Sequence, residues 1–241
     1  MQINGVKQKG SLHELGCFNM DSNIAVVTDP CYELETWCQA KVDNVLQGTW
    51  KGYVYSKVDT RSIESRDKRI LELKATIEKY KDLEERNPGI NDSFNDFFRE
   101  EISRLETINL SRVSVLIACH ESVDLESTSD WKLFDADIGV DSGQMSIAPI
   151  SSWSSEEVSL SYEGPETPNE EFPEIPHRGS TGPYWKICDI TCDEENIGAG
   201  IYDNRAAVSR SGYGDGSYQC YTLTVDNKVT GIAVVFIPEK S

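Results

Sequence analysis

The sequence predicts a mainly β protein, an antiparallel barrel or sandwich that carries an inserted α-helical hairpin and is α+β overall. Short apolar runs ending at polar turns predict the strands, and a charged stretch with near-heptad apolar spacing predicts the helices. A glycine-rich motif followed at once by a β-hairpin pattern predicts the last two strands. At 241 residues the chain can bury a full core, so we expect one β-rich domain over residues 1–241.

The first strand-like segment is the apolar run Ile24–Val27, because residues 1–23 carry only a weak pattern. This run leads into Asp29-Pro30, which is typical of a turn. Trp50–Val58 then alternates aromatic or aliphatic residues with polar ones, as a half-buried strand does.

A helical hairpin is expected over residues 60–110. From residue 61 to 86 apolar side chains recur close to heptad spacing, Pro88-Gly89 breaks the pattern, and a second apolar face follows. The two faces consist of Ile63, Ile70, Leu73, Ile77, Tyr80 and Leu83, and of Phe94, Phe97, Phe98, Ile102, Leu105 and Ile108. Such a hairpin could be a surface elaboration, a dimerisation arm or a lid over a polar site.

Strand character returns after the hairpin. The strand-like segments are Arg112–Cys119, Trp131–Phe134, Asp137–Val140, Met145–Ile150, Tyr184–Thr191 and Gly200–Arg210. Residues 151–183 are rich in Ser, Glu and Pro, which predicts an exposed acidic loop.

The motif Ser211–Tyr218 holds three glycines, one aspartate and two tyrosines. A hairpin pattern follows it, with strands over Tyr218–Val225 and Val229–Ile237 around the turn Asp226-Asn227-Lys228. Glycines at alternate positions let a ligand or another strand approach the backbone closely. Because the motif precedes a strand, no helix dipole supports phosphate binding there.

Two polar turns upstream, residues 28–32 and 139–144, are similar to the glycine motif. If the three turns meet at one end of the sheets, they form a pocket for a small ligand; otherwise their aspartates hydrogen-bond their own backbone. Converging carboxylates could also hold a cation. The predicted ligand-binding residues are Asp29, Tyr32, Asp141, Ser142, Gln144, Ser211, Tyr213, Asp215, Ser217 and Tyr218.

The motifs D-P-C-Y (29–32), V-D-S-G (140–143) and S-G-Y-G-D-G-S-Y (211–218), in this order, resemble those of domain of unknown function 4241 and related uncharacterised phage proteins. The resemblance covers the expected core strands and leaves out the helical hairpin and the acidic loop. It implies a β fold and a phage origin. It implies no mechanism, because such proteins have no assigned activity.

Catalytic signals are weak. The sequence has no Walker loop, dinucleotide fingerprint, H-E-x-x-H or G-x-S-x-G elbow, so an enzyme is not favoured and no cofactor is expected. A metal-assisted hydrolase built on the turn aspartates is the catalytic alternative. The seven cysteines are expected to be free thiols, although Cys188-x3-Cys192 could contribute to a metal site.

The net charge of −18 is concentrated in residues 121–203, which hold 19 acidic and three basic residues. This field disfavours direct nucleic-acid binding and anionic membranes, and it could dock a basic partner. No apolar run is long enough to span a membrane and the N-terminus lacks signal-peptide features, so a cytoplasmic location is expected.

These observations favour a non-enzymatic binding protein that holds or sequesters a small nucleotide-type ligand. If the chain comes from a phage, the ligand could be a host defence signal in the host cytoplasm. The alternative is an oligomeric interaction or virion accessory protein that uses the helical hairpin and the acidic surface. Under either reading a homo-oligomer is expected.

Overall fold

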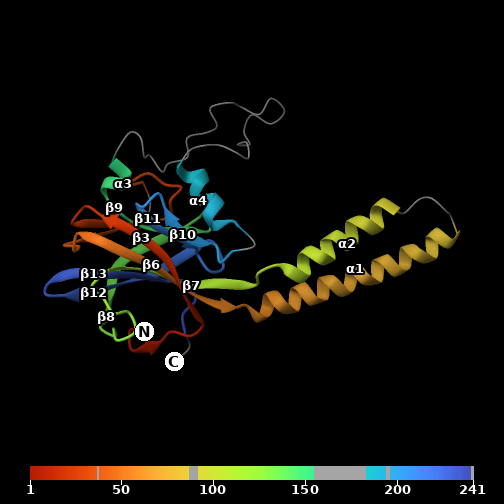
Figure 1. Ribbon diagram of the computed structural model, residues 1–241, viewed down its shortest axis with the longest axis horizontal. Coiled ribbons are helices and arrows are strands. Elements are labelled where there is room, and N and C mark those ends of the chain that lie inside the picture. The colour runs from red at the N-terminus through yellow and green to blue at the C-terminus, as the bar shows by residue number, and fades with distance from the viewer. Residues whose placement is uncertain (37, 87–91, 155–182, 194–195, 240–241) are drawn as a thin grey trace. The chain divides into compact units, whose positions relative to one another are not determined.

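The computed structural model describes residues 1–36, 38–86, 92–154, 183–193 and 196–239 (Figure 1). The chain divides into two compact units, one comprising Met1–Lys57 and Arg112–Ser241 and the other Val58–Ser111. The predicted class is confirmed, with 46% strand and 23% helix. Within the described residues no helix has a segment long and apolar enough to cross a membrane.

The larger unit contains two antiparallel sheets and a short two-stranded ribbon. The five-stranded sheet has the order β10(Ala199–Tyr202), β11(Ala206–Arg210), β9(Gln144–Pro149), β4(Ile24–Thr28), β5(Ala40–Asp43). The six-stranded sheet has the order β3(Ser11–Met20), β6(Gly48–Val58), β7(Ser111–His120), β13(Lys228–Val235), β12(Gly216–Val225), β8(Trp131–Val140). The ribbon pairs β1(Gln2–Ile3) with β2(Val6–Lys7).

The main core lies between the two sheets, which identifies a sandwich among the two predicted architectures. Phe18 and Trp50 from the six-stranded sheet and Val27 and Ile147 from the five-stranded sheet belong to one buried cluster. Alternate residues of the same strands point the opposite way. On the outer face of the five-stranded sheet, Val208 and other side chains pack against Ile187 of α4(Pro183–Thr191).

The structure corrects several of the sequence assignments. Residues 184–191 form the helix α4 and not a strand, and the weakly patterned residues 1–23 contain the ten-residue strand β3. Trp131–Val140 is one strand. Residues 151–154 form the short helix α3(Ser151–Ser154), while residues 155–182 of the predicted acidic loop lie outside the described residues.

The smaller unit is the predicted helical hairpin, formed by α1(Thr60–Arg86) and α2(Asp92–Thr107). Its buried seam consists of Ile70, Leu73, Ile77, Ile102 and Leu105, with Phe98 packed against it. Phe97, which was expected on the same face, is 62% exposed. Adjacent helical positions point about 100° apart, so Phe97 and Phe98 cannot both face a narrow seam.

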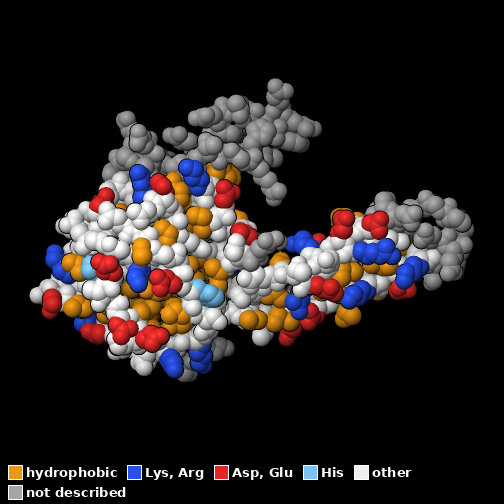
Figure 2. Space-filling model, viewed as in Figure 1, with side chains coloured by type: hydrophobic (Ala, Val, Ile, Leu, Met, Phe, Trp, Pro, Cys, Tyr) orange, Lys and Arg blue, Asp and Glu red, His pale blue; other side chains and the backbone are white. Residues whose placement is uncertain are grey.

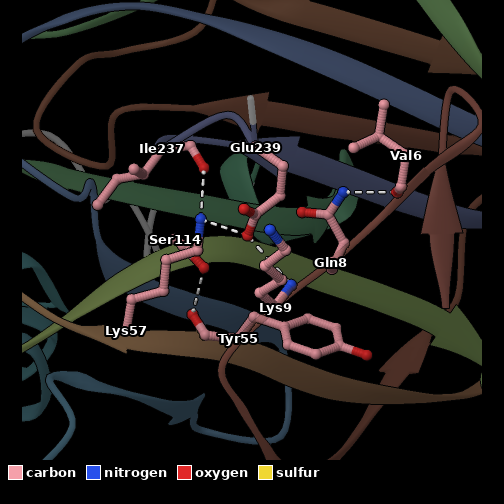
Figure 3. A network of polar contacts seen from close by, with 8 residues as sticks. All are labelled: Val6, Gln8, Lys9, Tyr55, Lys57, Ser114, Ile237 and Glu239. Carbon is pink, nitrogen blue, oxygen red and sulfur yellow. Dashed lines mark hydrogen bonds and ion pairs between the residues drawn. The ribbon is translucent and has the colours of Figure 1, made fainter. Parts of the chain in front are cut away.

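A polar network fastens the C-terminal segment to the six-stranded sheet (Figure 3). The carboxylate of Glu239 lies 2.5 Å from Lys57 Nζ and accepts a hydrogen bond of 3.1 Å from the Lys9 amide. Lys57 also donates to the Ile237 carbonyl at 3.3 Å. Burial opposes the ionisation of Glu239, but the hydrogen bonds and lysine charges outweigh it and lower its pKa below the ordinary 4.5.

Replacing Glu239 with glutamine is expected to lower the free energy of unfolding by about 1–2 kcal/mol at pH 7, because a charge-assisted hydrogen-bond network is lost. A lowered carboxyl pKa stabilises the fold fully above pH 4.5, and this contribution is lost as the pH falls further. In urea titrations the difference from wild type should therefore shrink at acidic pH. The control Glu14→Gln, whose pair with Lys51 is exposed and 3.8 Å long, should change little. Equal effects of the two substitutions would contradict this account.

Candidate functional site

The three motif turns meet at one place in the larger unit. The first turn follows β4, and its Asp29 carboxylate contacts the second turn, which connects β8 to β9. The second turn contacts the glycine loop through a hydrogen bond of 2.9 Å from the Ser211 amide to the Gly143 carbonyl. The residues come from segments distant in sequence, and the sheet pairing of β4, β9 and β11 brings them together. We call this region the three-turn face.

Asp29 is the centre of this arrangement. Its side chain is fully buried, and its two oxygens accept four hydrogen bonds from N–H and O–H groups, besides the one from the Cys31 thiol. The donors are the amides of Cys31, Asp141 and Ser142 and the Ser142 hydroxyl, at 2.7–3.0 Å. A buried carboxylate is tolerated only when such donors replace water. Asp29 therefore joins two turns, and its oxygens are already occupied.

The first turn also holds Cys31 and Tyr32. Burial and a hydrogen bond to Asp29 raise the pKa of the Cys31 thiol to about 12, which keeps this sulfur protonated at neutral pH. The Tyr32 hydroxyl donates to Asp141 at 2.8 Å, and this hydrogen bond raises the Tyr32 pKa to about 12. Both side chains thus add to the contact between the first two turns.

The glycine loop is closed by its own hydrogen bonds. Tyr218 donates to the Ser211 carbonyl at 2.8 Å and also to the Gly214 carbonyl, and the Ser211 hydroxyl donates to the latter at 2.7 Å. Gly143 has φ +72° and Gly214 φ +107°, and a β-carbon on Gly143 would lie 3.9 Å from Gly214 Cα. The glycines therefore permit the left-handed backbone on both sides of this contact.

Three predicted site residues of the loop face solvent. Tyr213 is 59% exposed, and both Asp215 and Ser217 are exposed as well. The Arg112 guanidinium lies 5.2 Å from the Tyr213 ring centroid and donates to the Gly212 carbonyl at 3.3 Å. A cation so placed holds the ring in position through its π face. The loop thus presents an aromatic ring beside a carboxylate.

Gln144 is buried and turns away from solvent, towards the helix α4. Its Nε2 lies 3.3 Å from Cys188 Sγ and 3.8 Å from Cys192 Sγ. Tyr184, one turn before Cys188, is close enough to Ser142 and Cys188 for both to influence its ionisation; burial is the largest cause that raises its pKa. The sequence suggested Cys188 and Cys192 only as possible metal ligands and did not place Tyr184 with them, although positions 184, 188 and 192 share one face at helical spacing.

The carboxylates do not gather around a common point for a cation. Asp29 is saturated by protein donors, Asp141 accepts from Tyr32, and Asp215 is exposed. Among the residues that the structure describes, no group of three or more His, Cys, Asp or Glu side chains is arranged to hold a metal ion.

Two hollows lie away from the three-turn face. One of about 590 Å³ is lined by residues between Ser122 and Asp130 and between Leu223 and Thr230, together with Leu46. Another of about 320 Å³ lies between Asn19, Pro149 and Arg205. Neither includes any of the ten predicted site residues, so each is a competing location for a ligand.

No family model, curated protein or solved structure shows a significant match to this chain. The fold and the site together define an antiparallel β-sandwich with a three-turn face and a helical hairpin. The resemblance to domain of unknown function 4241 remains a prediction.

Asp29→Asn is expected to destabilise the larger unit by about 1–3 kcal/mol, because only one acceptor oxygen remains and the new NH2 group must face either the Cys31 amide or the Asp141 and Ser142 amides. Urea unfolding followed by tryptophan fluorescence measures the loss. The control Asp215→Asn changes an exposed carboxyl in the same region and should have an effect below about 0.5 kcal/mol. A loss under 1 kcal/mol for Asp29→Asn would show that its hydrogen bonds do not hold the turns.

Proposed function

We propose that the protein is a non-enzymatic binding protein that holds a small nucleotide-type ligand on the three-turn face. The observation that carries this proposal is the exposed Tyr213 ring, held by Arg112 on a loop whose backbone is hydrogen-bonded to the second turn. A ring that is already ordered loses little entropy when a planar ligand stacks on it. Nucleobases bind such surfaces by stacking.

The side chains near Tyr213 are better suited to contact the base and sugar of a nucleotide than its phosphates. Asp215 and Ser217 lie exposed in the same loop and can accept from amino and hydroxyl groups. The chain carries a net charge of −18, which repels phosphates at long range. We therefore expect ligands with few phosphates to bind more tightly than polyphosphates. Sequestration of a host defence signal by a phage protein rests on the motif resemblance alone.

Tyr213→Ala is expected to weaken ligand binding about tenfold or more, because one base-stacking contact is worth about 1–3 kcal/mol. Isothermal titration with nucleosides, cyclic and linear mononucleotides and the corresponding triphosphates measures this effect. The matched control Val225→Asp lies in the 590 Å³ hollow and should leave affinity unchanged. Loss of affinity in Val225→Asp alone would move the site to the hollow, and absence of binding by every probe would refute the proposal.

A second candidate function is self-association through the hairpin. Leu71 and Phe97 are 68% and 62% exposed although they lie on helices with a separate buried seam. Residues 58–111 hold 10 basic and 13 acidic residues, so two hairpins repel each other far less than two acidic larger units. Figure 2 shows hydrophobic side chains exposed between charged ones along the hairpin. We propose a second copy of this chain as the partner.

Combining Leu71→Glu with Phe97→Glu should then halve the mass measured by light scattering, because charges would be buried at the hairpin interface. Leu12→Glu, an exposed apolar position on β3, is the matched control and should not change the mass. A wild-type protein that is monomeric at high micromolar concentration would rule out this function.

A further inference from the structure

The strongest chemical cluster outside the proposed ligand surface is a pair of cysteines at the end of α4. Cys188 is half-buried on the helix, and Cys192 is exposed one residue beyond its last turn. The two side chains are hydrogen-bonded to each other, and Gln144 Nε2 contacts both sulfurs. Gln144 Oε1 is buried and has no partner among the described atoms, so these sulfur contacts are what hold the amide.

The two sulfurs have different electrostatic surroundings. The hydrogen bond from Cys188 lowers the pKa of Cys192 to about 6, aided by Thr191, the Arg210 charge and Gln144, against the effect of burial. The same hydrogen bond and burial raise the pKa of Cys188. Tyr184 also lies beside Cys188, and burial raises the Tyr184 pKa, so this side chain is neutral at pH 7. The carboxylates next to the two cysteines in sequence are Asp189 and Asp193. Cys192 is thus the thiolate and Cys188 the thiol.

Arg210 of β11 fixes the helix end that carries this pair. Its guanidinium donates to the carbonyls of Thr191 and Asp193, which no further helical turn can satisfy. Gly198 has φ +69°, and a β-carbon there would overlap Arg210. The glycine therefore leaves room for the arginine to lie across the helix terminus.

We propose that Cys188 and Cys192 form a redox-active dithiol that exchanges with low-molecular-weight disulfides, a function separate from ligand binding at the three-turn face. The Cys192 thiolate attacks one sulfur of the small disulfide, forms a mixed disulfide and expels one thiolate, which takes a proton from solvent. The Cys188 thiol loses its proton to solvent and attacks Cys192 Sγ. A Cys188–Cys192 bond forms, and the second small thiol leaves and is protonated.

Closing this bond requires a movement at the helix end. Side chains four residues apart on a helix have β-carbons about 5–6 Å apart, whereas a disulfide needs about 3.5–4.5 Å. Cys192 lies beyond α4, so its segment is the part that can shift. The shift would release Gln144 from the sulfurs and disturb the Arg210 contacts. Because Arg210 directly precedes the glycine loop, a displacement of Arg210 on oxidation would also change the position of that loop on the three-turn face.

Glutathione disulfide, followed by mass spectrometry of the intact protein and its peptides, tests the proposal. Wild type should lose two hydrogens, retain no glutathione and yield a peptide linked between Cys188 and Cys192. Cys188→Ser should instead retain one glutathione on Cys192, because the resolving thiol is gone. Cys192→Ser should react at least tenfold more slowly, and the control Cys17→Ser, which removes another exposed cysteine, should behave as wild type.

The pH dependence of alkylation distinguishes a reactive Cys192 thiolate from a cysteine that is only exposed to solvent. Iodoacetamide should label Cys192 with a half-maximal rate near pH 6, and Cys188→Ala should move this midpoint upward because the hydrogen bond to the thiolate is lost. Circular dichroism confirms that each variant is folded. The proposal is overturned if wild type retains glutathione without forming the linked peptide, if Cys192→Ser reacts at the wild-type rate, or if the midpoint lies near the ordinary value of about 8.5.

Discussion

The buried carboxylate of Asp29 is the interaction on which the rest of the site depends. It accepts the consecutive amides of Asp141 and Ser142, which belong to a turn 112 and 113 residues further along the chain. A charge in this position is stable only while all its donors stay in place, because the interior offers no water to replace them. The carboxylate therefore selects one geometry for the two turns and penalises any other.

Each further contact follows from that fixed turn. Gly143 presents its carbonyl to Ser211, and this bond positions the glycine loop that carries Tyr213. Gln144 begins β9 with its amide directed at the sulfurs of Cys188 and Cys192. The three-turn face and the dithiol therefore both contact the start of β9, through Gly143 and Gln144 respectively. A ligand on one side and a change of oxidation state on the other would act on the same backbone.

The sequence was informative where a local pattern decides the structure. The alternation in Trp50–Val58, the near-heptad spacing of Ile70, Leu73 and Ile77, and the final hairpin each predicted the correct element. The segment Tyr184–Thr191 was wrongly predicted to be a strand. Tyr184, Ile187 and Cys188 have helical spacing, but a nine-residue helix is too short to show a clear period. Strand β3 has a weak pattern since only two of its ten residues are buried.

The turns that make up the site could be predicted from the sequence, but the burial and the contacts of their side chains could not. Asp29, Asp141 and the glycine loop were recognisable as turn motifs, and the structure brings these turns together. The burial of Asp29 and the direction of Gln144 depend on pairings between strands far apart in sequence, which no local pattern encodes. For the same reason Cys188 and Cys192 were identified as a pair but not as neighbours of Arg210 and Gln144.

Hydrogen exchange at single amides measures the central claim most directly. The Asp141 and Ser142 amides lie in an irregular turn, so their protection depends on the Asp29 carboxylate and not on a sheet ladder. We expect both amides to exchange as slowly as those of β9 in the wild-type protein and to lose that protection in Asp29→Ala, which removes their acceptor, while β9 keeps its own. Rapid exchange of both amides in the wild-type protein would contradict the account.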